Sequence, residues 1–431
     1  MDSVKASWKK SLFFLVVFSS QVAEGSARLS AVDAFKAIMI DGVDLPQVLG
    51  NPIKQYSLAA VIDDEMEPIP FQIDEYNEGG AVYFEGWDVP LVGTEGVFDE
   101  EDKLLFINKD AGERYRSRHR YDGKIIHEIT LTDKNGSQRY AYLVEGSRLR
   151  SDEQYVRYSA DEALVETDFY SITYNKENNL NWDDFSIVNY DGDENPFDAL
   201  KIRLNTGVLT NMVTLELNNE DLIAQAKGER IGPIRTTTQM ELIFWFLKLP
   251  FVKVSLQLHH YPNSLLYDAR AILPAARRKM LVDPKIRMAL EGNRLFGTEI
   301  RTASGPKQPA ITDGHMDDIE KAHIEHGISI DNNWIWADTQ RNLDFAAFFT
   351  FNSEREQEIS FYYNDEKDIL DPPERFPGQL PVAGYLMHTL PPSGFFGFTV
   401  NIHLSNGYEG EPEDFTSALR TLPAINVSSP K

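Results

Sequence analysis

The clearest structural signal in the sequence is the segment at residues 124–131, which reads KIIHEITL. Every second residue from Ile125 to Leu131 is apolar except His127, and polar residues such as Glu128 fall between them. This alternation is typical of a β-strand that packs one face on a core and turns the other toward solvent. We therefore predict a strand here, with His127 as a buried core histidine whose hydrogen bonds are satisfied.

The same pattern recurs along the chain in short segments separated by turn residues. The clearest of these segments are residues 138–144, 199–204, 345–351, 359–363 and 395–404. The segments 345–351 and 359–363 flank a polar stretch, which predicts a hairpin with a long solvated loop. Many short strands joined by polar turns are typical of an all-β fold, and we predict a mostly antiparallel β-sandwich.

Helical signals are few and lie together, which predicts a short helical insertion around residues 265–326. Asp283 and Pro284 are typical of a helix start and Gly292 of a helix stop, so residues 285–291 are predicted to be helical. Residues 317–326, which are followed by a glycine, form a second predicted helix.

The first residues are typical of a secretory signal. Lys5, Lys9 and Lys10 precede an apolar run at residues 12–18, and small residues follow it as far as Ala27. We therefore predict a signal peptide at residues 1–27 and export of the mature protein to the periplasm, the outer cell surface or the medium.

The chain of 431 residues is long enough for two domains or for one large β domain. A turn-rich stretch near residues 147–152 interrupts two strand-like segments. We therefore predict an N-terminal β domain at residues 28–150 and a larger β-sandwich domain, with the helical insertion, at residues 151–431. One continuous domain is the alternative.

The composition excludes several classes of chemistry. Cysteine is absent, which rules out disulfides, thiol nucleophiles and cysteine-bound zinc, haem or iron–sulfur clusters. There are 67 Asp and Glu residues against 42 Lys and Arg, which gives a formal net charge of −25. We expect no nucleic-acid partner, because phosphate binding needs an excess of clustered basic residues.

Two segments have residues of the kind that bind metals. Asp191, Asp193 and Asn195 have a D-x-D-x-N spacing that aims oxygen ligands at one point, as Ca²⁺ requires. An EF-hand is excluded because a proline replaces the glycine at the sixth position, and a solvated acidic turn is the alternative. His323 and His326 are spaced to chelate a transition metal on one helix, but histidines in a last helical turn also complement the helix dipole.

For catalysis the candidates are a pair of carboxylates, which the spacing of the acids does not single out, or the set His259, Tyr261 and Arg270. His259 and Tyr261 end a predicted strand, and with Arg270 they would supply acid, base and charge-neutralising groups in a cleft that binds a glycan. The G-x-S-x-G motif of serine hydrolases is absent from the sequence. Whether the protein is an enzyme is left open by these residues.

Three further features are typical of binding surfaces. Trp334 and Trp336 alternate on one predicted strand, so their indoles share a face and either stack on a sugar ring or fill the core. Arg277 and Arg278 lie in a basic stretch that suits an anionic ligand or pairs with acids of the chain itself. The apolar segment from Phe244 to Phe251 is predicted to be a hairpin tip that either fills the core or contacts a membrane or another protein.

These features lead to three hypotheses. The first is an exported, acidic β-sandwich protein that binds a carbohydrate, such as a polysaccharide, or another component of the cell envelope, with Ca²⁺ as a candidate structural ion. The second is a glycan-active enzyme, either a polysaccharide hydrolase or a lyase. The third is a structural envelope protein that docks through the apolar hairpin tip.

Overall fold

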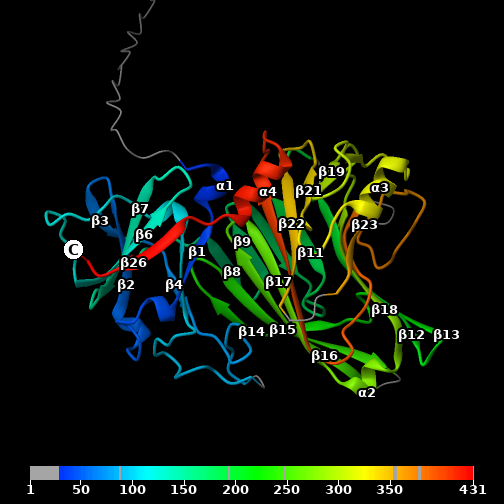
Figure 1. Ribbon diagram of the computed structural model, residues 1–431, viewed down its shortest axis with the longest axis horizontal. Helices are drawn as coiled ribbons and strands as arrows, with labels where there is room; N and C mark the ends of the chain where they lie inside the picture. Colours follow the sequence, from blue (N-terminus) through cyan, green and yellow to red (C-terminus); the bar gives the residue numbers. More distant parts are fainter. Residues whose placement is uncertain are drawn as a thin grey trace, which may run out of the picture.

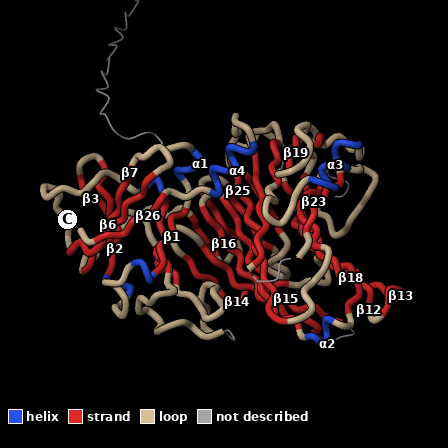
Figure 2. The backbone as a smooth tube through the Cα atoms, in the orientation of Figure 1, coloured by secondary structure: helices blue, strands red, loops and turns tan. Residues whose placement is uncertain are grey.

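The computed structural model describes residues 29–86, 89–192, 195–246, 249–352, 357–376 and 380–430, without the side chains of residue 211 and residues 245–251. Within this part of the chain antiparallel β-sheets dominate and the helices are short (Figure 2). The prediction of an all-β sandwich is therefore confirmed. The predicted signal peptide at residues 1–27 lies outside the described residues.

A smaller lobe is built from the first strands of the chain and the last one (Figure 1). Its two sheets share a core to which Ile38 and Phe106 contribute from one sheet and Leu58 and Leu143 from the other. The first sheet consists of β1 (Ala37–Asp41), β5 (Lys103–Ile107) and β4 (Gln72–Asp74). The second consists of β26 (Ala424–Ser428), β6 (Lys124–Thr132), β7 (Gln138–Glu145), β2 (Tyr56–Ile62) and β3 (Glu65–Pro68).

Strand β26 shows that the two parts of the chain are interleaved. It pairs with β6, from Ala424 opposite Thr132 to Ser428 opposite Glu128. The last strand of the chain thus completes a sheet of the smaller lobe, although it falls inside the range 151–431 predicted for the larger domain. The division of the chain into independent domains stays a prediction.

The larger part of the molecule is organised around a nine-stranded sheet (Figure 1). Apolar residues alternate along its long strands, for example Leu265, Tyr267 and Ala269 on one face of a single strand. In spatial order the strands are β14 (Ala224–Ile231), β15 (Thr236–Phe246), β16 (Leu249–Tyr261), β17 (Ser264–Leu273), β25 (Gly394–Ser405), β22 (Asp344–Phe351), β21 (Ile335–Asp338), β19 (Glu299–Thr302) and β20 (Ala310–Ile311).

Two smaller sheets pack on the apolar face of the nine-stranded sheet and share one hydrophobic core with it. The five-stranded sheet has the order β13 (Thr210–Leu217), β12 (Phe197–Val208), β18 (Leu281–Gly292), β24 (Val382–Met387) and β23 (Ile359–Asn364). The four-stranded sheet has the order β11 (Trp182–Ile187), β10 (Tyr170–Tyr174), β9 (Leu164–Thr167) and β8 (Val156–Ser159).

The helices are peripheral to these sheets. The α-helices are α1 (Ala31–Ala34), α2 (Ala275–Arg278), α3 (Asp318–His326) and α4 (Pro412–Arg420), and the 3₁₀ turns are η1 (Gly42–Asp44), η2 (Ile53–Gln55) and η3 (Asn108–Asp110). Helix α3 matches the helix predicted at residues 317–326. Asp317 caps it and Glu320 completes a capping box, which satisfies backbone N–H groups of the first turn.

The helix predicted at residues 285–291 is wrong, because these residues belong to strand β18. Ile286 and Leu290 alternate along it toward the core, and the strand pairs with β12 on one side and β24 on the other. Asp283 has a positive φ of 48° beside a register shift against β12, so the Asp283-Pro284 pair forms an irregularity in a strand. Pairing on both sides outweighs the local helix signals.

The hairpin predicted from residues 345–351 and 359–363 is also wrong. Strand β22 pairs with β21 and β25 in the nine-stranded sheet, whereas β23 pairs with β24 in the five-stranded sheet. The chain therefore crosses from one sheet of the sandwich to the other between these strands. Alternation alone predicts that two strands exist and does not specify which sheet each of them joins.

Candidate functional site

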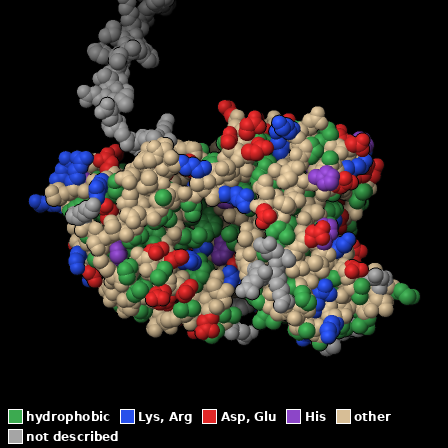
Figure 3. Space-filling view, in the orientation of Figure 1, with side chains coloured by type: hydrophobic (Ala, Val, Ile, Leu, Met, Phe, Trp, Pro, Cys, Tyr) green, Lys and Arg blue, Asp and Glu red, His purple; other side chains and the backbone are tan. Residues whose placement is uncertain are grey.

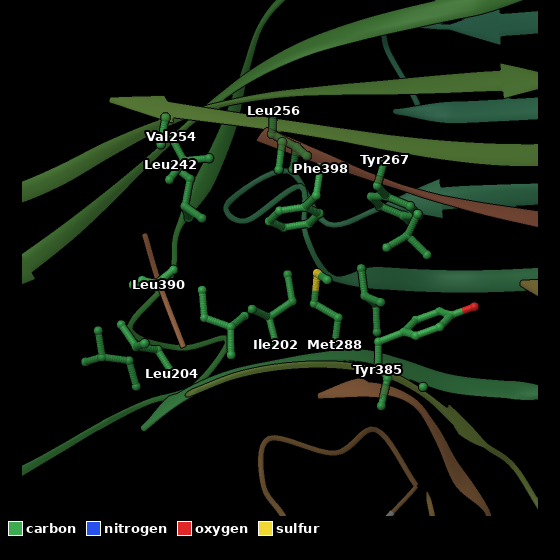
Figure 4. A pocket seen from close by; sticks show the side chains of 18 of the residues that line it. Ile202, Leu204, Leu242, Val254, Leu256, Tyr267, Met288, Tyr385, Leu390 and Phe398 are labelled. Atoms are coloured by element: carbon green, nitrogen blue, oxygen red, sulfur yellow. The ribbon is translucent and has the colours of Figure 1, made fainter. Parts of the chain in front are cut away.

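An apolar cavity of about 150 Å³ lies between the nine-stranded and the five-stranded sheets (Figure 4). Side chains of the two sheets face one another across it, with Leu242, Val254 and Phe398 on one side and Ile202 and Met288 on the other. Of the residues that line it, only Tyr267, Arg270 and Tyr385 have side chains with polar groups. The cavity is therefore suited to an apolar ligand.

Small residues at inward-facing positions account for the empty space. In one row across the nine-stranded sheet, Ala271 stands in register between Val254 and Phe396. In the next row Ala269 stands between Leu256 and Phe398. Strand β17 thus offers only a methyl group at two successive inward positions where its neighbours offer large side chains, and the opposite sheet does not fill the gap.

The three polar side chains direct their polar groups to other partners. The hydroxyl of Tyr385 donates to the carbonyl oxygen of Asn333 at 2.9 Å. The hydroxyl of Tyr267 interacts with the side chain of Tyr174. The guanidinium of Arg270 binds Asp268 and the carbonyl oxygens of Gly79 and Gly80 in the smaller lobe. A ligand in the cavity therefore meets hydrocarbon surface on both sides.

The catalytic candidates His259, Tyr261 and Arg270 lie along one junction between the smaller lobe and the nine-stranded sheet. Arg235 is central to this junction: its Nε and Nη2 lie 2.8 and 2.7 Å from Oδ2 of Asp74. Its Nη1 donates to the hydroxyl of Tyr261 at 2.7 Å. The junction thus consists of a buried ion pair with hydrogen bonds from both sides.

The protonation of these groups fits a structural junction better than acid–base catalysis. Nδ1 of His259 lies 2.9 Å from the hydroxyl of Thr237, and burial, aided by the charges of Arg235 and Arg270, lowers the pKa of His259 well below its usual value. Burial also raises the pKa of Tyr261, although the charge of Arg235 opposes this effect. Both pKa values are therefore shifted away from neutral pH, whereas an acid–base catalyst needs a pKa near the working pH. The proposed catalytic roles stay predictions.

The neighbouring His260 points to the interior and gives a testable pH dependence. Its ring nitrogens lie 3.2 and 3.1 Å from the hydroxyls of Tyr170 and Tyr174, and burial lowers its pKa to about 3. Below pH 6.5 the unfolded chain protonates this histidine, whereas the folded protein does not. The free energy of unfolding should therefore fall as the pH drops from 6.5 toward 3.

The variant His260→Asn should show a shallower loss of stability across that pH range, because the asparagine takes up no proton. Thermal unfolding measured at a series of pH values checks this expectation, with His326→Gln as the control because His326 is exposed. Equal pH dependence in wild type and His260→Asn would show that His260 is not a source of the effect.

The indoles of Trp334 and Trp336 share a face, but the structure offers neither to a sugar. They are 5 % and 4 % exposed and pack with Phe415 of helix α4. In the structure the two indoles are therefore part of the core, which was the alternative interpretation of the pair. His127 is also buried as predicted, although neither of its ring nitrogens has a hydrogen-bond partner among the described residues.

The acidic turn predicted to bind Ca²⁺ is only partly described, because Asp193 lies outside the described residues. Asp191 is exposed, and the side-chain oxygen of Asn195 already accepts a hydrogen bond from Ser186 at 3.0 Å. The amide nitrogen of Asn195 bonds to Asp184. These contacts hold Asn195 in place without an ion, and Ca²⁺ binding stays a prediction.

The two helix histidines are in different environments. His323 is buried, with Nδ1 at 2.8 Å from the hydroxyl of Thr302 and Nε2 at 2.9 Å from the carbonyl oxygen of Gln308. Both ring nitrogens are therefore engaged, whereas His326 is exposed at the end of α3. In the described part of the chain, no three His, Asp or Glu side chains gather closely enough to hold a metal ion.

The segment from Phe244 to Phe251 forms a hairpin, as predicted, since β15 and β16 pair as far as Phe246 opposite Leu249. Phe244 and Val252 are half-buried and line the cavity, and the tip side chains between them lie outside the described residues. Arg277 is exposed on α2, whereas the Nε of Arg278 donates to the carbonyl oxygens of Leu390 and Pro391 at 3.2 and 3.1 Å.

None of the sequence-based candidates except Arg270 and Phe244 lines the cavity, and sequence reasoning missed the cavity itself. The signal that could have found it is the pair Ala269 and Ala271, which are small residues at alternate positions of a strand otherwise rich in large apolar side chains. Their effect depends on the opposite sheet, and the sequence does not align the two sheets.

No helix in the described residues is long and apolar enough to cross a membrane. No family model matches the sequence, and no curated protein matches it. Solved structures to which the chain is similar include an α-mannosidase from Enterococcus faecalis V583, at 10% identity and a TM-score of 0.47. A glycosyl hydrolase family 38 protein from Enterococcus faecalis has 9% identity and a TM-score of 0.42.

Each of these two matches covers 92% of this chain but only 44% and 46% of the other chain. This chain therefore corresponds to less than half of those proteins. The Slr1438 protein from Synechocystis sp. PCC 6803 has 12% identity and a TM-score of 0.34, with 59% of this chain and 97% of that chain covered.

Proposed function

We propose that this protein binds the acyl chain of a fatty acid or lipid in the cavity between its two large sheets. One observation carries the proposal: a cavity of about 150 Å³ whose lining is apolar apart from three residues that bond elsewhere. The sequence left several envelope components open as ligands. Of these, an apolar one fits the lining of the cavity best. The predicted export signal would deliver the protein to the compartment where such lipids occur.

A carbohydrate is a poor fit for this cavity. Sugar hydroxyls buried without hydrogen-bond partners would each cost free energy, whereas each methylene group buried gains about 0.8 kcal/mol. A water-sized sphere needs roughly 10–15 Å³ by the same kind of measure, so the space suits about ten such spheres. A methylene group is of similar size, and a chain of about ten carbons would fill the cavity.

A chain-length series tests the proposal. Calorimetric titration with fatty acids from hexanoate to tetradecanoate should give affinities that rise about fourfold per methylene group, since about 0.8 kcal/mol is gained each time and 1.4 kcal/mol corresponds to tenfold. The rise should level off once the cavity is full. Neutral and acidic oligosaccharides serve as matched controls and should not compete with the acids.

Two outcomes would contradict the proposal. One is an affinity for fatty acids that does not depend on chain length, because such binding would not involve burial of the chain. The other is displacement of a bound fatty acid by an oligosaccharide, which would show that the site recognises polar groups.

A further inference from the structure

A second cavity, of about 170 Å³, lies on the other side of the five-stranded sheet from the apolar one. Arg287 and Glu291 of β18 line it, and along the strand they alternate with residues such as Met288, which line the apolar cavity. Tyr362 and Asn364 of β23 line it as well. The other lining residues come from the segment between β23 and β24 or from the start of β24, and they are Ile369, Leu370, Asp371, Leu380 and Val382. We call this cavity the polar pocket.

Buried charges form the floor of the polar pocket. Nζ of Lys201 lies 2.8 Å from Oε2 of Glu291, and these two side chains are 1% and 3% exposed. Nε of Arg203 lies 2.9 Å from Oδ1 of Asp371, and the guanidinium of Arg287 contacts the other oxygen of the same carboxylate. Each cation therefore already contacts a carboxyl group, so that the pocket suits an uncharged ligand better than an anion. Figure 3 agrees with this, because acidic and basic side chains lie side by side on the surface around α3 and β23.

The wall of the polar pocket has hydrogen-bonding capacity that the protein does not use. The hydroxyl of Tyr362 accepts a hydrogen bond from Nη1 of Arg287 at 2.6 Å, and its own O–H has no acceptor among the described residues. The side-chain oxygen of Asn364 accepts from the N–H of Glu366 at 3.1 Å, but its amide nitrogen donates to no residue in the described part of the chain. The carboxylate of Asp371 is 30% exposed and has further lone pairs. Both donors and acceptors are thus available to a ligand.

The pocket is held open by the sheet below it and by an anchored segment above it. Tyr362 is in register with Gly384 of β24, so no side chain of that strand stands between Tyr362 and β18. The guanidinium of Arg287 reaches across this gap and lies 4.5 Å from the centroid of the Tyr362 ring. The segment after β23 is fixed by Arg375, whose N–H donates to Oδ1 of Asp198 at 2.8 Å and whose Nε donates to the carbonyl oxygen of Asp198 at 2.7 Å.

The size and lining of the polar pocket suit one sugar ring. At roughly 10–15 Å³ for each water-sized sphere, the volume suits about a dozen non-hydrogen atoms, as in a hexose. Ile369 and Leu370 are 55% and 61% exposed, and they would gain from contact with the C–H groups of the ring. The hydroxyl groups of the sugar would meet the polar groups of Tyr362, Asn364 and Asp371, and would therefore keep the hydrogen bonds that the apolar cavity denies them.

We propose that the polar pocket binds one ring of an uncharged sugar. Tyr362 and Asn364 donate hydrogen bonds to hydroxyl groups of the ring, and Asp371 accepts one. The site goes beyond the proposed fatty-acid site and does not depend on it, because the five-stranded sheet lies between the two cavities.

Titration calorimetry with the methyl glycosides of glucose, galactose and mannose tests the proposal. At least one of them should bind with a Kd of about 10 mM or tighter, and cyclohexanol, a ring with a single hydroxyl, should bind at least tenfold more weakly. The variants Tyr362→Phe and Asn364→Asp should each lose about threefold to tenfold in affinity, because each removes a hydrogen-bond donor. Asn364→Asp keeps the oxygen that accepts from Glu366.

Tyr140→Phe is the matched control. Tyr140 lies on β7 in the smaller lobe, and its hydroxyl also takes part in one hydrogen bond, which it donates to Gln138 at 2.7 Å. The control should keep the affinity of wild type within about twofold, because distant substitutions act independently. Hydrogen–deuterium exchange on the wild type needs no variant: the bound methyl glycoside should slow exchange at residues 365–371 and leave exchange in β7 unchanged.

Three results would overturn the proposal. They are absence of binding by all three methyl glycosides, wild-type affinity in both folded pocket variants, and slowed exchange confined to segments other than residues 365–371. Failure of this site is distinguishable from failure of the fatty-acid site. Ala269→Leu/Ala271→Leu should keep the affinity for the methyl glycoside, and Tyr362→Phe should keep the affinity for fatty acids. Displacement of the methyl glycoside by a fatty acid would contradict the existence of two separate sites.

Discussion

Filling the cavity from one strand, with Ala269→Leu and Ala271→Leu together, should reduce the affinity for a decanoate-length fatty acid by at least tenfold. Each leucine places a larger apolar group in space that the ligand would occupy, and about 0.8 kcal/mol is lost for each methylene group of the ligand that no longer fits. Displacement of a fluorescent fatty acid measures the change.

The same double variant should fold at least as well as wild type. The new side chains enter empty space, so their burial does not require neighbours to move as it would in a filled core. Thr350→Leu is the matched control, because Thr350 is exposed on the same sheet. Unchanged fatty-acid binding in the double variant, with binding also unchanged in the control, would place the ligand outside the cavity.

Removing the cation at the junction of the two lobes should cause the largest loss of stability. Arg235→Met leaves Asp74 buried without its partner, and breaking a buried ion pair in this way costs about 3–5 kcal/mol. The side chains of Arg235 and Asp74 are 4% and 9% exposed, so water does not replace the lost contact. Denaturation in urea, followed by far-ultraviolet circular dichroism, measures the free energy of unfolding.

The double variant Arg235→Met/Asp74→Leu shows whether the lost stability comes from the unpaired carboxylate of Asp74. It removes both charges, so that no unpaired carboxylate remains, and it should recover a large part of the lost stability. If the double variant is as unstable as the single one, the loss comes from the hydrogen bonds to Tyr76 and Tyr261 or from packing, and not from the unpaired carboxylate.

Local sequence signals predicted the elements that depend on local contacts. The capping pair Asp317 and Glu320 lies within one helical turn, and helix α3 begins where these residues predict. The alternation in the segment 124–131 predicts strand β6, although a register shift between Ile125 and His127 changes which face each residue occupies. Such shifts depend on the partner strand and are not encoded by spacing alone.

Features that depend on distant segments were not predictable in this way. Asp283 and Pro284 begin a helix in many proteins, but here β12 and β24 pair with the residues that follow. The binding role considered for Trp334 and Trp336 depended on an open face, which α4 covers from nearly eighty residues further along the chain. The cavity likewise arises only where Ala269 and Ala271 face the five-stranded sheet.

The position of a bound acyl chain tests the central claim most directly. Crystals grown with a fatty acid that carries bromine on its terminal carbon should give an anomalous diffraction peak between the two sheets, near Ala269 and Met288. A peak on the outer face of either sheet, or a refined structure in which the cavity stays empty while the fatty acid binds elsewhere, would contradict the account.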